Sequence, residues 1–140
     1  MKGFYLKWLT VFIGILILAA SCRNYDPVLP SEPTLVNPWE QVTGDIYGFF
    51  LLNEGNMGTN QASLDYYDYE TGVYTRNIYG ERNPYEVKDL GDVGNDIQIY
   101  GDKLWAVINC SNYVEVMDVN TAKHITKIAI PNCRYLAFKD

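Results

Sequence analysis

The feature that most constrains the fold is an internal repeat of short β-strands. Residues 94–130 contain four apolar runs separated by tight turns. The four runs are NDIQIY (95–100), KLWAVIN (103–109), YVEVMDV (113–119) and KHITKIAI (123–130). Four strands within about 37 residues match the size of one β-propeller blade. The pattern therefore predicts an all-β fold built from four-stranded antiparallel repeats.

A related pattern occurs earlier in the chain. YGFFLLN (47–53) matches KLWAVIN, and LDYYDYETG (64–72) matches VEVMDVNTA (114–122) at an offset of 50 residues. Both copies place an Asp and a Thr in one hairpin, Asp68 with Thr71 and Asp118 with Thr121. Such side chains accept backbone N–H groups and shape tight turns. A Ca²⁺ loop at Asp118 is the functional alternative, but it falls far short of about six to eight oxygen ligands.

These matches divide most of the chain into blades. The expected units are a blade at 46–80 with its last strand at 73–79, a connector at 81–93, a blade at 94–130 and the start of a further blade at 132–140. The last assignment depends on CRYLAFKD, which matches NDIQIYGD at an offset of 38 and so pairs Tyr135 with Ile97. A propeller needs about four to eight blades to close. About two blades and one strand therefore suggest an N-terminal fragment of a longer protein, with a small stand-alone β-sandwich as the rival.

The N-terminus has the features of an export signal. Lys2 and Lys7 frame a positive segment, and the apolar run 8–20 is shorter than the roughly 20 residues of a membrane span. Small residues at 19–21 precede Cys22 directly, which resembles the lipobox of bacterial lipoproteins. In that motif the cysteine is acylated and becomes the first residue of the mature protein. We expect 1–21 to be a lipoprotein signal peptide; a plain cleaved signal or an uncleaved anchor are the alternatives.

Residues 22–45 are expected to form a tether. This range holds four of the six prolines and no apolar periodicity, which favours extended polyproline geometry. The alternative is an N-terminal arm that packs on the folded part. The formal net charge is −6, with a single His, so a basic nucleic-acid surface over the whole chain and multi-His metal sites are excluded. No cofactor or metal site is expected.

Propeller geometry suggests one candidate ligand face. The loops between second and third strands emerge on the same face as the connections between blades. That face would carry Asn53, Glu54, Asn56, Asn95, Asp96, Asn112, Asn132 and Arg134. Amides and an Arg that converge on a rim can bind polar ligands. The alternative is that these Asn residues only shape turns, because Asn tolerates left-handed backbone geometry.

Two cysteines remain beyond Cys22. Cys110 and Cys133 fall in two loops on the same expected face, and export permits a disulfide between them. Two free thiols are the alternative. A catalytic cysteine is disfavoured because His124 falls in the outermost strand, away from both.

The runs FFLLNEGN, LDYYDYETG and VGNDIQIYGDKLWAVINCSNYVEVMDVNTAKHITKIAIPNCRYLAF resemble one protein group. It is the YncE-like, surface-layer-type β-propeller lipoproteins of Bacteroides-type bacteria, and the resemblance covers about residues 46–140. It implies a β-propeller, often seven-bladed. Some similar propellers act as surface partners of TonB-dependent transporters, and one type captures cobalamin.

Three functions follow as expectations. The first is a lipid-anchored, exported binding module at the outer membrane or cell surface, which captures a small nutrient or docks a TonB-dependent transporter. It is not an enzyme and binds no nucleic acid. The second is a structural surface-layer-type protein without a ligand. The third is part of a propeller enzyme whose active site lies in further blades, because no catalytic constellation is evident in these residues.

Overall fold

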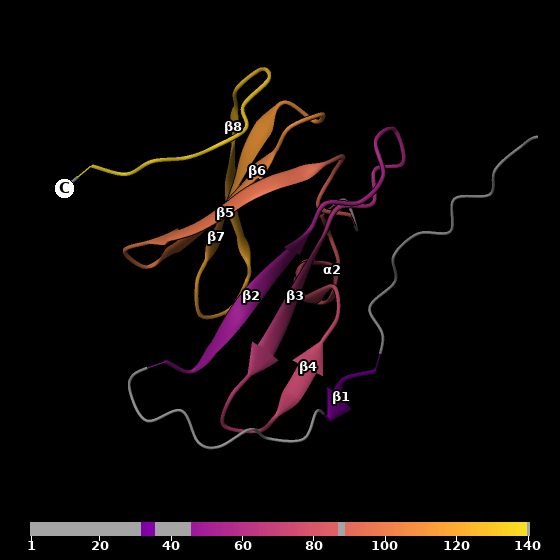
Figure 1. Ribbon diagram of the computed structural model, residues 1–140, viewed down its shortest axis with the longest axis vertical. Helices are drawn as coiled ribbons and strands as arrows, with labels where there is room; N and C mark the ends of the chain where they lie inside the picture. Colours follow the sequence, from indigo (N-terminus) through magenta and orange to yellow (C-terminus); the bar gives the residue numbers. More distant parts are fainter. Residues whose placement is uncertain (1–31, 36–45, 87–88, 140) are drawn as a thin grey trace, which may run out of the picture.

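The computed structural model describes residues 32–35, 46–86 and 89–139. Within them the chain is all-β, as predicted, with two four-stranded antiparallel sheets and one short helix (Figure 1). The expected signal peptide, the lipidated Cys22 and most of the expected tether lie outside the described residues. No helix among the described residues is long and apolar enough to cross a membrane.

The first sheet contains β2 (Gly48–Asn53), β3 (Ser63–Asp68), β4 (Val73–Thr75) and β1 (Thr34–Leu35), in the order β1-β4-β3-β2. The β1 strand comes from the range expected to be a tether. It pairs with β4 through Thr34 opposite Tyr74 and Leu35 opposite Val73. These two residues are therefore part of the sheet rather than of a free linker.

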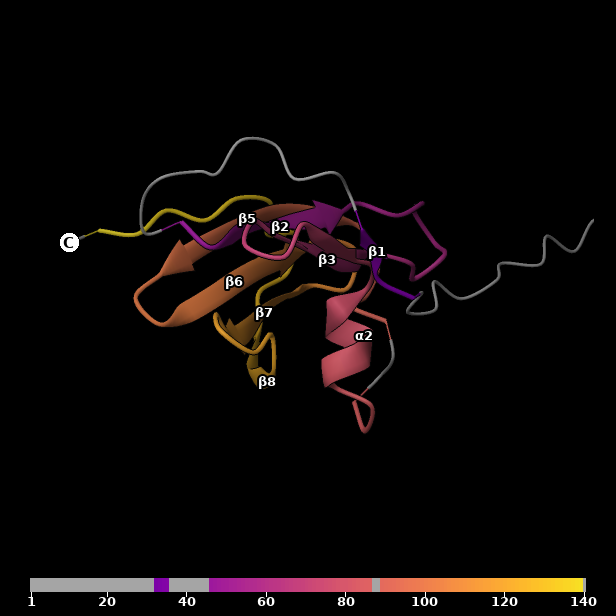
Figure 2. The same ribbon diagram turned by 90° about the horizontal axis from the view of Figure 1, so that it is seen from below.

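The last strand of the first sheet is shorter than predicted. It ends at Thr75, and the short helix α2 (Ile78–Arg82) follows where the sequence suggested strand up to residue 79. Asn77 causes the change: its backbone is left-handed at φ 46°, and its side chain accepts the Gly80 N–H as a helix N-cap. Asn83 then joins the helix to the second sheet by donating to the Ala122 carbonyl at 2.9 Å. Figure 2 shows α2 on the same side of the molecule as β8.

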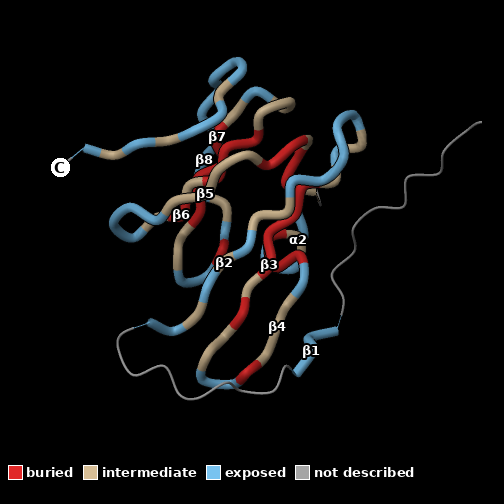
Figure 3. The backbone as a smooth tube through the Cα atoms, in the orientation of Figure 1, coloured by how far each residue is buried: buried red, intermediate tan, exposed pale blue. Residues whose placement is uncertain are grey.

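The second sheet is a simple meander. It contains β5 (Gly94–Tyr100), β6 (Lys103–Ile108), β7 (Tyr113–Asp118) and β8 (His124–Ala129), in the order β5-β6-β7-β8. All four strands coincide closely with the predicted runs. The apolar side chains between the two sheets form the core, with Leu64, Tyr79, Leu104 and Met117 essentially inaccessible to solvent (Figure 3).

The matched hairpins of the two sheets have the same turn. Asp68 Oδ1 accepts the N–H groups of the second and third residues after it at 2.8 and 2.9 Å, and Asp118 Oδ1 does so at 3.0 and 2.9 Å. Both turns close with the same backbone bond, from Gly72 N–H to Asp68 O and from Ala122 N–H to Asp118 O, each 2.9 Å long. The two sheets are therefore repeats in structure as well as in sequence.

The equivalent turns show that the sequence alignment of β2 with β6 was wrong by one residue. Tyr69 N–H donates to Tyr47 O, and Val119 N–H donates to Asp102 O in the corresponding place. Residue 47 thus corresponds to 102, an offset of 55, whereas the sequence match of YGFFLLN with KLWAVIN gave 56. The strand β2 is the counterpart of β6. Among the described residues, the first sheet therefore lacks a counterpart of β5 and carries β1 at its opposite edge.

The expected first strand of a further blade does not form a strand. Residues 133–139 run in extended form across the second sheet, held by side chains rather than by a backbone ladder (Figure 1). The Asp96 carboxylate accepts the Leu136 N–H at 2.8 Å, and the Phe138 ring stacks on Tyr100 at 4.4 Å. Tyr135, matched by sequence to the partly buried Ile97, is instead 76% exposed.

Candidate functional site

Four segments meet at one end of the molecule, here called the loop end. They are the β2–β3 loop (54–62), the segment before β5 (89–93), the β6–β7 turn (109–112) and the segment after β8 (130–134). Backbone bonds join them: Ala62 N–H to Gly91 O at 2.9 Å, Cys110 N–H to Asp92 O at 3.1 Å, and Ile130 N–H to Asn112 O at 3.0 Å. The segments that the sequence assigned to one face thus lie together.

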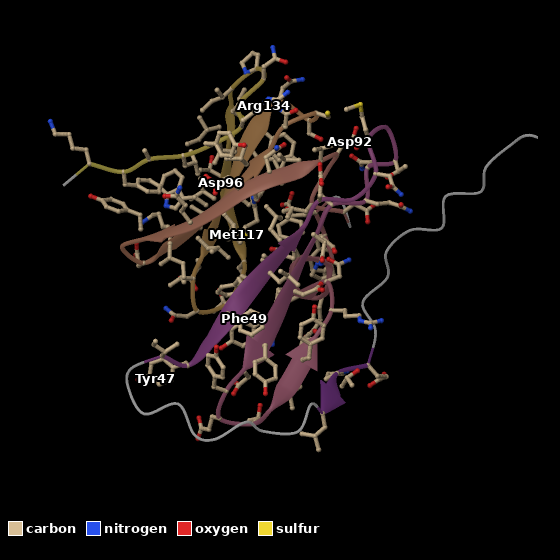
Figure 4. All side chains as sticks on the ribbon, in the orientation of Figure 1. Tyr47, Phe49, Asp92, Asp96, Met117 and Arg134 are labelled. Carbon is tan, nitrogen blue, oxygen red and sulfur yellow. The ribbon has the colours of Figure 1, made fainter. Side chains whose placement is uncertain are left out.

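Asp92 fixes the geometry of the loop end (Figure 4). Both of its carboxylate oxygens accept the Gly58 N–H, at 3.0 and 2.9 Å, across 34 residues of sequence. Its own N–H donates to the Ser111 hydroxyl at 2.8 Å. One half-buried aspartate therefore ties three of the four segments together. Sequence reasoning placed this residue in a featureless connector and missed its role, because the partners are distant in the chain.

The predicted ligand residues divide into two groups. Three are half-buried: the Asn53 amide donates to Ser63, Asp96 holds the segment after β8, and the buried Asn95 Oδ1 has no hydrogen-bond partner among the described residues. The remaining five have exposed side-chain positions, namely Glu54, Asn56, Asn112, Asn132 and Arg134. Turn geometry accounts for part of this second group, since the backbones of Asn112 and Asn132 are left-handed at φ 59° and 57°. Asn112 Oδ1 also accepts the Asn132 N–H at 3.1 Å.

The candidate disulfide is absent. Cys110 and Cys133 are both free and half-buried. Their sulfurs contact different acceptors: Cys110 Sγ lies 3.6 Å from Asn109 Oδ1, and Cys133 Sγ lies 3.7 Å from the Tyr113 carbonyl. The loop end brings the two cysteines into one region without joining them, so the alternative of two free thiols describes this structure.

A second polar cluster, not anticipated from the sequence, lies inside the second sheet. The Glu115 side chain is fully buried, and its Oε1 contacts His124 Nδ1 at 2.5 Å. Its Oε2 lies 3.7 Å from Lys127 Nζ, and the Tyr79 hydroxyl of α2 is buried nearby without a hydrogen-bond partner. His124 is therefore half-buried against an acid rather than simply facing solvent.

Burial dominates the electrostatics of this cluster. It raises the pKa of Glu115 above its ordinary value, and the neighbouring His124 and Lys127 only partly oppose the shift. Burial and the Glu115 charge also raise the pKa of Tyr113 to about 12. The cluster lies between β7, β8 and α2 rather than at the loop end, and the His124 and Lys127 side chains reach its solvent side.

A groove lies at the opposite end from the loop end. It has a volume of ≈ 720 Å³ and opens between the start of β2, the β3–β4 turn, the end of β5 and the β7–β8 turn. Tyr47, labelled far from Asp92 in Figure 4, lies on its wall with Phe50 and Ile99. The predicted ligand face and this groove are thus separate features. Among residues 32–35, 46–86 and 89–139, no cluster of three or more His, Cys, Asp or Glu side chains could hold a metal ion.

Comparison with protein families gives one match. The family described as a domain of unknown function, DUF5074, matches residues 47–138. The chain belongs to this family. The match covers β2 to β8, the loop end and the Glu115 cluster, whereas β1 lies before it. Comparison with curated proteins gives no match.

Proposed function

We propose that this DUF5074 protein is a lipid-anchored, exported β-propeller module that binds a small ligand or docks a TonB-dependent transporter through its loop end. The observation that carries the proposal is the tie between segments of both sheets at one end, with Asp92 at its centre. A face made of several short connections on a rigid β-scaffold is the usual place for recognition residues. Arg134 and the three exposed amides Asn56, Asn112 and Asn132 supply polar groups there.

The propeller architecture is supported by the repeat. Two sheets with the same Asp-centred turn pack face to face, and residues 133–139 lie against the second sheet near β5. Two hydrogen bonds occur at equivalent places in the repeat. The Gly94 N–H donates to the Glu54 carbonyl at 3.0 Å, and the Asn109 side-chain amide donates to the Cys133 carbonyl at 2.7 Å. Each unit thus begins beside the end of the preceding unit's second strand, as radially arranged blades require.

The anchor and the location follow from the sequence at the N-terminus. The apolar run 8–20 and the small residues before Cys22 favour acylation of that cysteine and export. Several acyl chains on one residue anchor a protein stably, at about 0.8 kcal/mol per buried CH₂ group. The resemblance to YncE-like, surface-layer-type propellers of Bacteroides-type bacteria supports the outer membrane or cell surface as the location.

Labelling with palmitate in a bacterial host tests the anchor. We expect incorporation into the wild-type chain, no incorporation into Cys22→Ala, and retained incorporation into Cys110→Ala as the matched control. Unchanged labelling of Cys22→Ala would contradict the lipoprotein proposal.

Site-specific photo-crosslinking in the native host tests the binding face. A photoreactive residue at position 57, where the Met57 side chain is 78% exposed at the loop end, is expected to crosslink to a TonB-dependent transporter. The same residue at position 120, exposed at the opposite end, is the control. Crosslinks that are equal from both positions, or absent from position 57, would favour the alternative of a structural envelope protein.

A further inference from the structure

We infer that the C-terminal end of α2 is a pH-dependent latch on the second sheet. The latch is closed while the Glu115–His124 pair is electrically neutral, and it loosens when the loss of a proton leaves the pair negative. The start of α2 is held by the first sheet through contacts that do not involve this pair. The inference depends neither on the anchor nor on any ligand of the loop end.

The helix α2 depends on its attachments to the two sheets. It has five residues, and a helix of that length is not stable without packing. Its start is attached to the first sheet, because the Asn77 N–H donates to Asp65 Oδ1 of β3 at 2.8 Å. Its buried side chains, Ile78 and Tyr79, pack in the core between the sheets. Its end is therefore free to respond to changes in the second sheet alone.

The end of α2 is attached to the first residue of β8 (Figure 2). The Asn83 side chain accepts the backbone N–H of His124 at 2.8 Å and donates to the Ala122 carbonyl at 2.9 Å. The side chain of the same His124 contacts Glu115 through Nδ1. One residue of β8 thus joins the end of the helix to the buried acid.

Two buried polar atoms near α2 have no hydrogen-bond partner among the described residues. They are the Tyr79 hydroxyl and Glu115 Oε2. The two side chains lie close together, since burial and then the Glu115 charge raise the pKa of Tyr79. A buried polar atom without a partner costs free energy that hydration restores. Release of the end of α2 admits water to both atoms and so recovers part of what the docking contacts lose.

The charge of the pair decides this balance. The titratable groups around Glu115 are Tyr113 of its own strand, His124 and Lys127 of β8, and Tyr79 of α2, with Glu86 beyond the helix acting on Tyr79. When the pair becomes negative, the nearest opposing charge is Lys127 Nζ, which is 3.7 Å from Glu115 Oε2 and partly exposed. Burial raises the pKa of Glu115, so the docked form holds a proton more tightly than a hydrated, released form. Docking therefore weakens as pH rises.

The first experiment measures amide hydrogen exchange of the whole chain in mild detergent by NMR. Protection factors, which correct for the intrinsic effect of pH, are compared between the latch amides Asn83 and His124 and the reference amides Asn77 and Asp92. The reference N–H groups bond to other partners, Asp65 and Ser111. We expect lower protection at the latch amides than at the reference amides. It should fall about tenfold between about pH 5 and about pH 8, the factor that a pKa difference of one unit produces.

Urea separates a local opening from unfolding of the whole chain. Low urea concentrations should leave the exchange of the latch amides unchanged, because a local opening exposes little surface. Equal protection at latch and reference amides, with the same response to urea, would overturn the latch. Protection at the latch amides that does not fall with rising pH would also overturn it.

The second experiment assigns the pH dependence to the pair. Glu115→Gln cannot become negative, so the protection of the latch amides is expected to stay constant over the same pH range. Lys127→Gln removes the opposing charge and is expected to enlarge the fall, whereas Lys123→Gln, at an exposed lysine of the same chain segment, is the matched control and retains the wild-type fall. A fall that persists in folded Glu115→Gln would refute the latch. Equal falls in the two lysine variants would refute it even if Glu115→Gln does not fold.

Discussion

The two sheets place a buried carboxylate at the same position of the repeat and satisfy it differently. In the first sheet, Asp65 Oδ2 accepts the Tyr74 hydroxyl at 2.6 Å, and Oδ1 accepts the N–H of Asn77 at 2.8 Å. Glu115 follows Asp65 by 50 residues and contacts His124, which follows Tyr74 by the same number. The same position of the repeat therefore holds an acid with neutral donors in the first sheet, and an acid next to an ionisable His in the second sheet.

The two acids differ in how completely their carboxylate oxygens are hydrogen-bonded, and this gives them different effects on stability. Tyr74 stays a hydrogen-bond donor across the physiological range, because burial and the bond to Asp65 raise its pKa to about 12. The Asp65 contacts therefore fix the path of the chain from β4 to α2. Glu115 is buried more completely, and one of its oxygens has no hydrogen-bond partner. Its ionised form opposes folding more than that of a fully hydrogen-bonded acid.

Removal of the Asp65 carboxylate is expected to have the largest effect. Asp65→Ala leaves the Tyr74 hydroxyl and the Asn77 N–H without their acceptor, and two bonds to a charged group are worth about 3 kcal/mol. Chemical denaturation should therefore show a loss of about that size in the free energy of unfolding. Glu70→Ala, an exposed acid on the next turn, is the control. A loss equal to that of the control would show that Asp65 does not organise the first sheet.

Glu115→Gln is expected to change how stability depends on pH. Burial raises the Glu115 pKa above its ordinary 4.5, so the folded chain holds this proton more tightly than the unfolded chain. The contribution of Glu115 to stability is then complete below about pH 4.5 and is lost as pH rises through the raised pKa. The stability of the wild type minus that of Glu115→Gln should fall with rising pH in denaturation series. A difference that stays constant or rises would contradict the assignment, and Glu70→Gln is the control.

Much of this comparison could be predicted from the sequence. Alternation and turn residues located all four strands of the second sheet, and the 50-residue match located the shared hairpin of both sheets. The same match contained the pair Asp65 and Glu115, yet nothing in it showed that both acids are buried. Burial depends on packing against α2, and the Asn77 cap that starts this short helix carries no periodic signal.

The predictions that failed, and the contacts that were missed, depend on geometry that a local sequence pattern does not report. The alignment of β2 was wrong by one residue because apolar residues fill both faces of that strand, so alternation could not fix its register. The pairing of β1 with β4 and the tie from Asp92 to Gly58 join segments far apart in sequence. The sequence left the pairing of Cys110 and Cys133 open, and only side-chain geometry could show that they are not bonded.

The Asp-centred turns are expected to differ modestly in strength. Both aspartates accept two backbone N–H groups, but Asp118 also accepts the Thr121 hydroxyl at 2.8 Å. We expect Asp68→Ala to cost about 1 kcal/mol and Asp118→Ala about 1.5 kcal/mol, because solvent replaces part of each lost bond. Thermal unfolding of both variants measures the difference. In a Thr121→Ala background, the further loss caused by Asp118→Ala should equal that caused by Asp68→Ala. If Asp68→Ala and Asp118→Ala already cause equal losses in the chain that retains Thr121, the hydroxyl has no such role.

The smallest predicted effect concerns the residue that closes each turn. Gly72 has φ 67° and its counterpart Ala122 has φ 54°, so the same left-handed position holds glycine in one sheet and alanine in the other. Alanine in this conformation costs roughly 1 kcal/mol, and part of that cost is offset because alanine also restricts the unfolded chain. Gly72→Ala should therefore lower the free energy of unfolding by only about 0.5 kcal/mol. Gly72→Val is the comparison variant. It should lower the free energy of unfolding more than Gly72→Ala does, because a β-branched residue is far less tolerant of positive φ. A loss from Gly72→Ala as large as that from Gly72→Val would mean that the two turns, despite the same closing backbone bond, do not accept the same side chain.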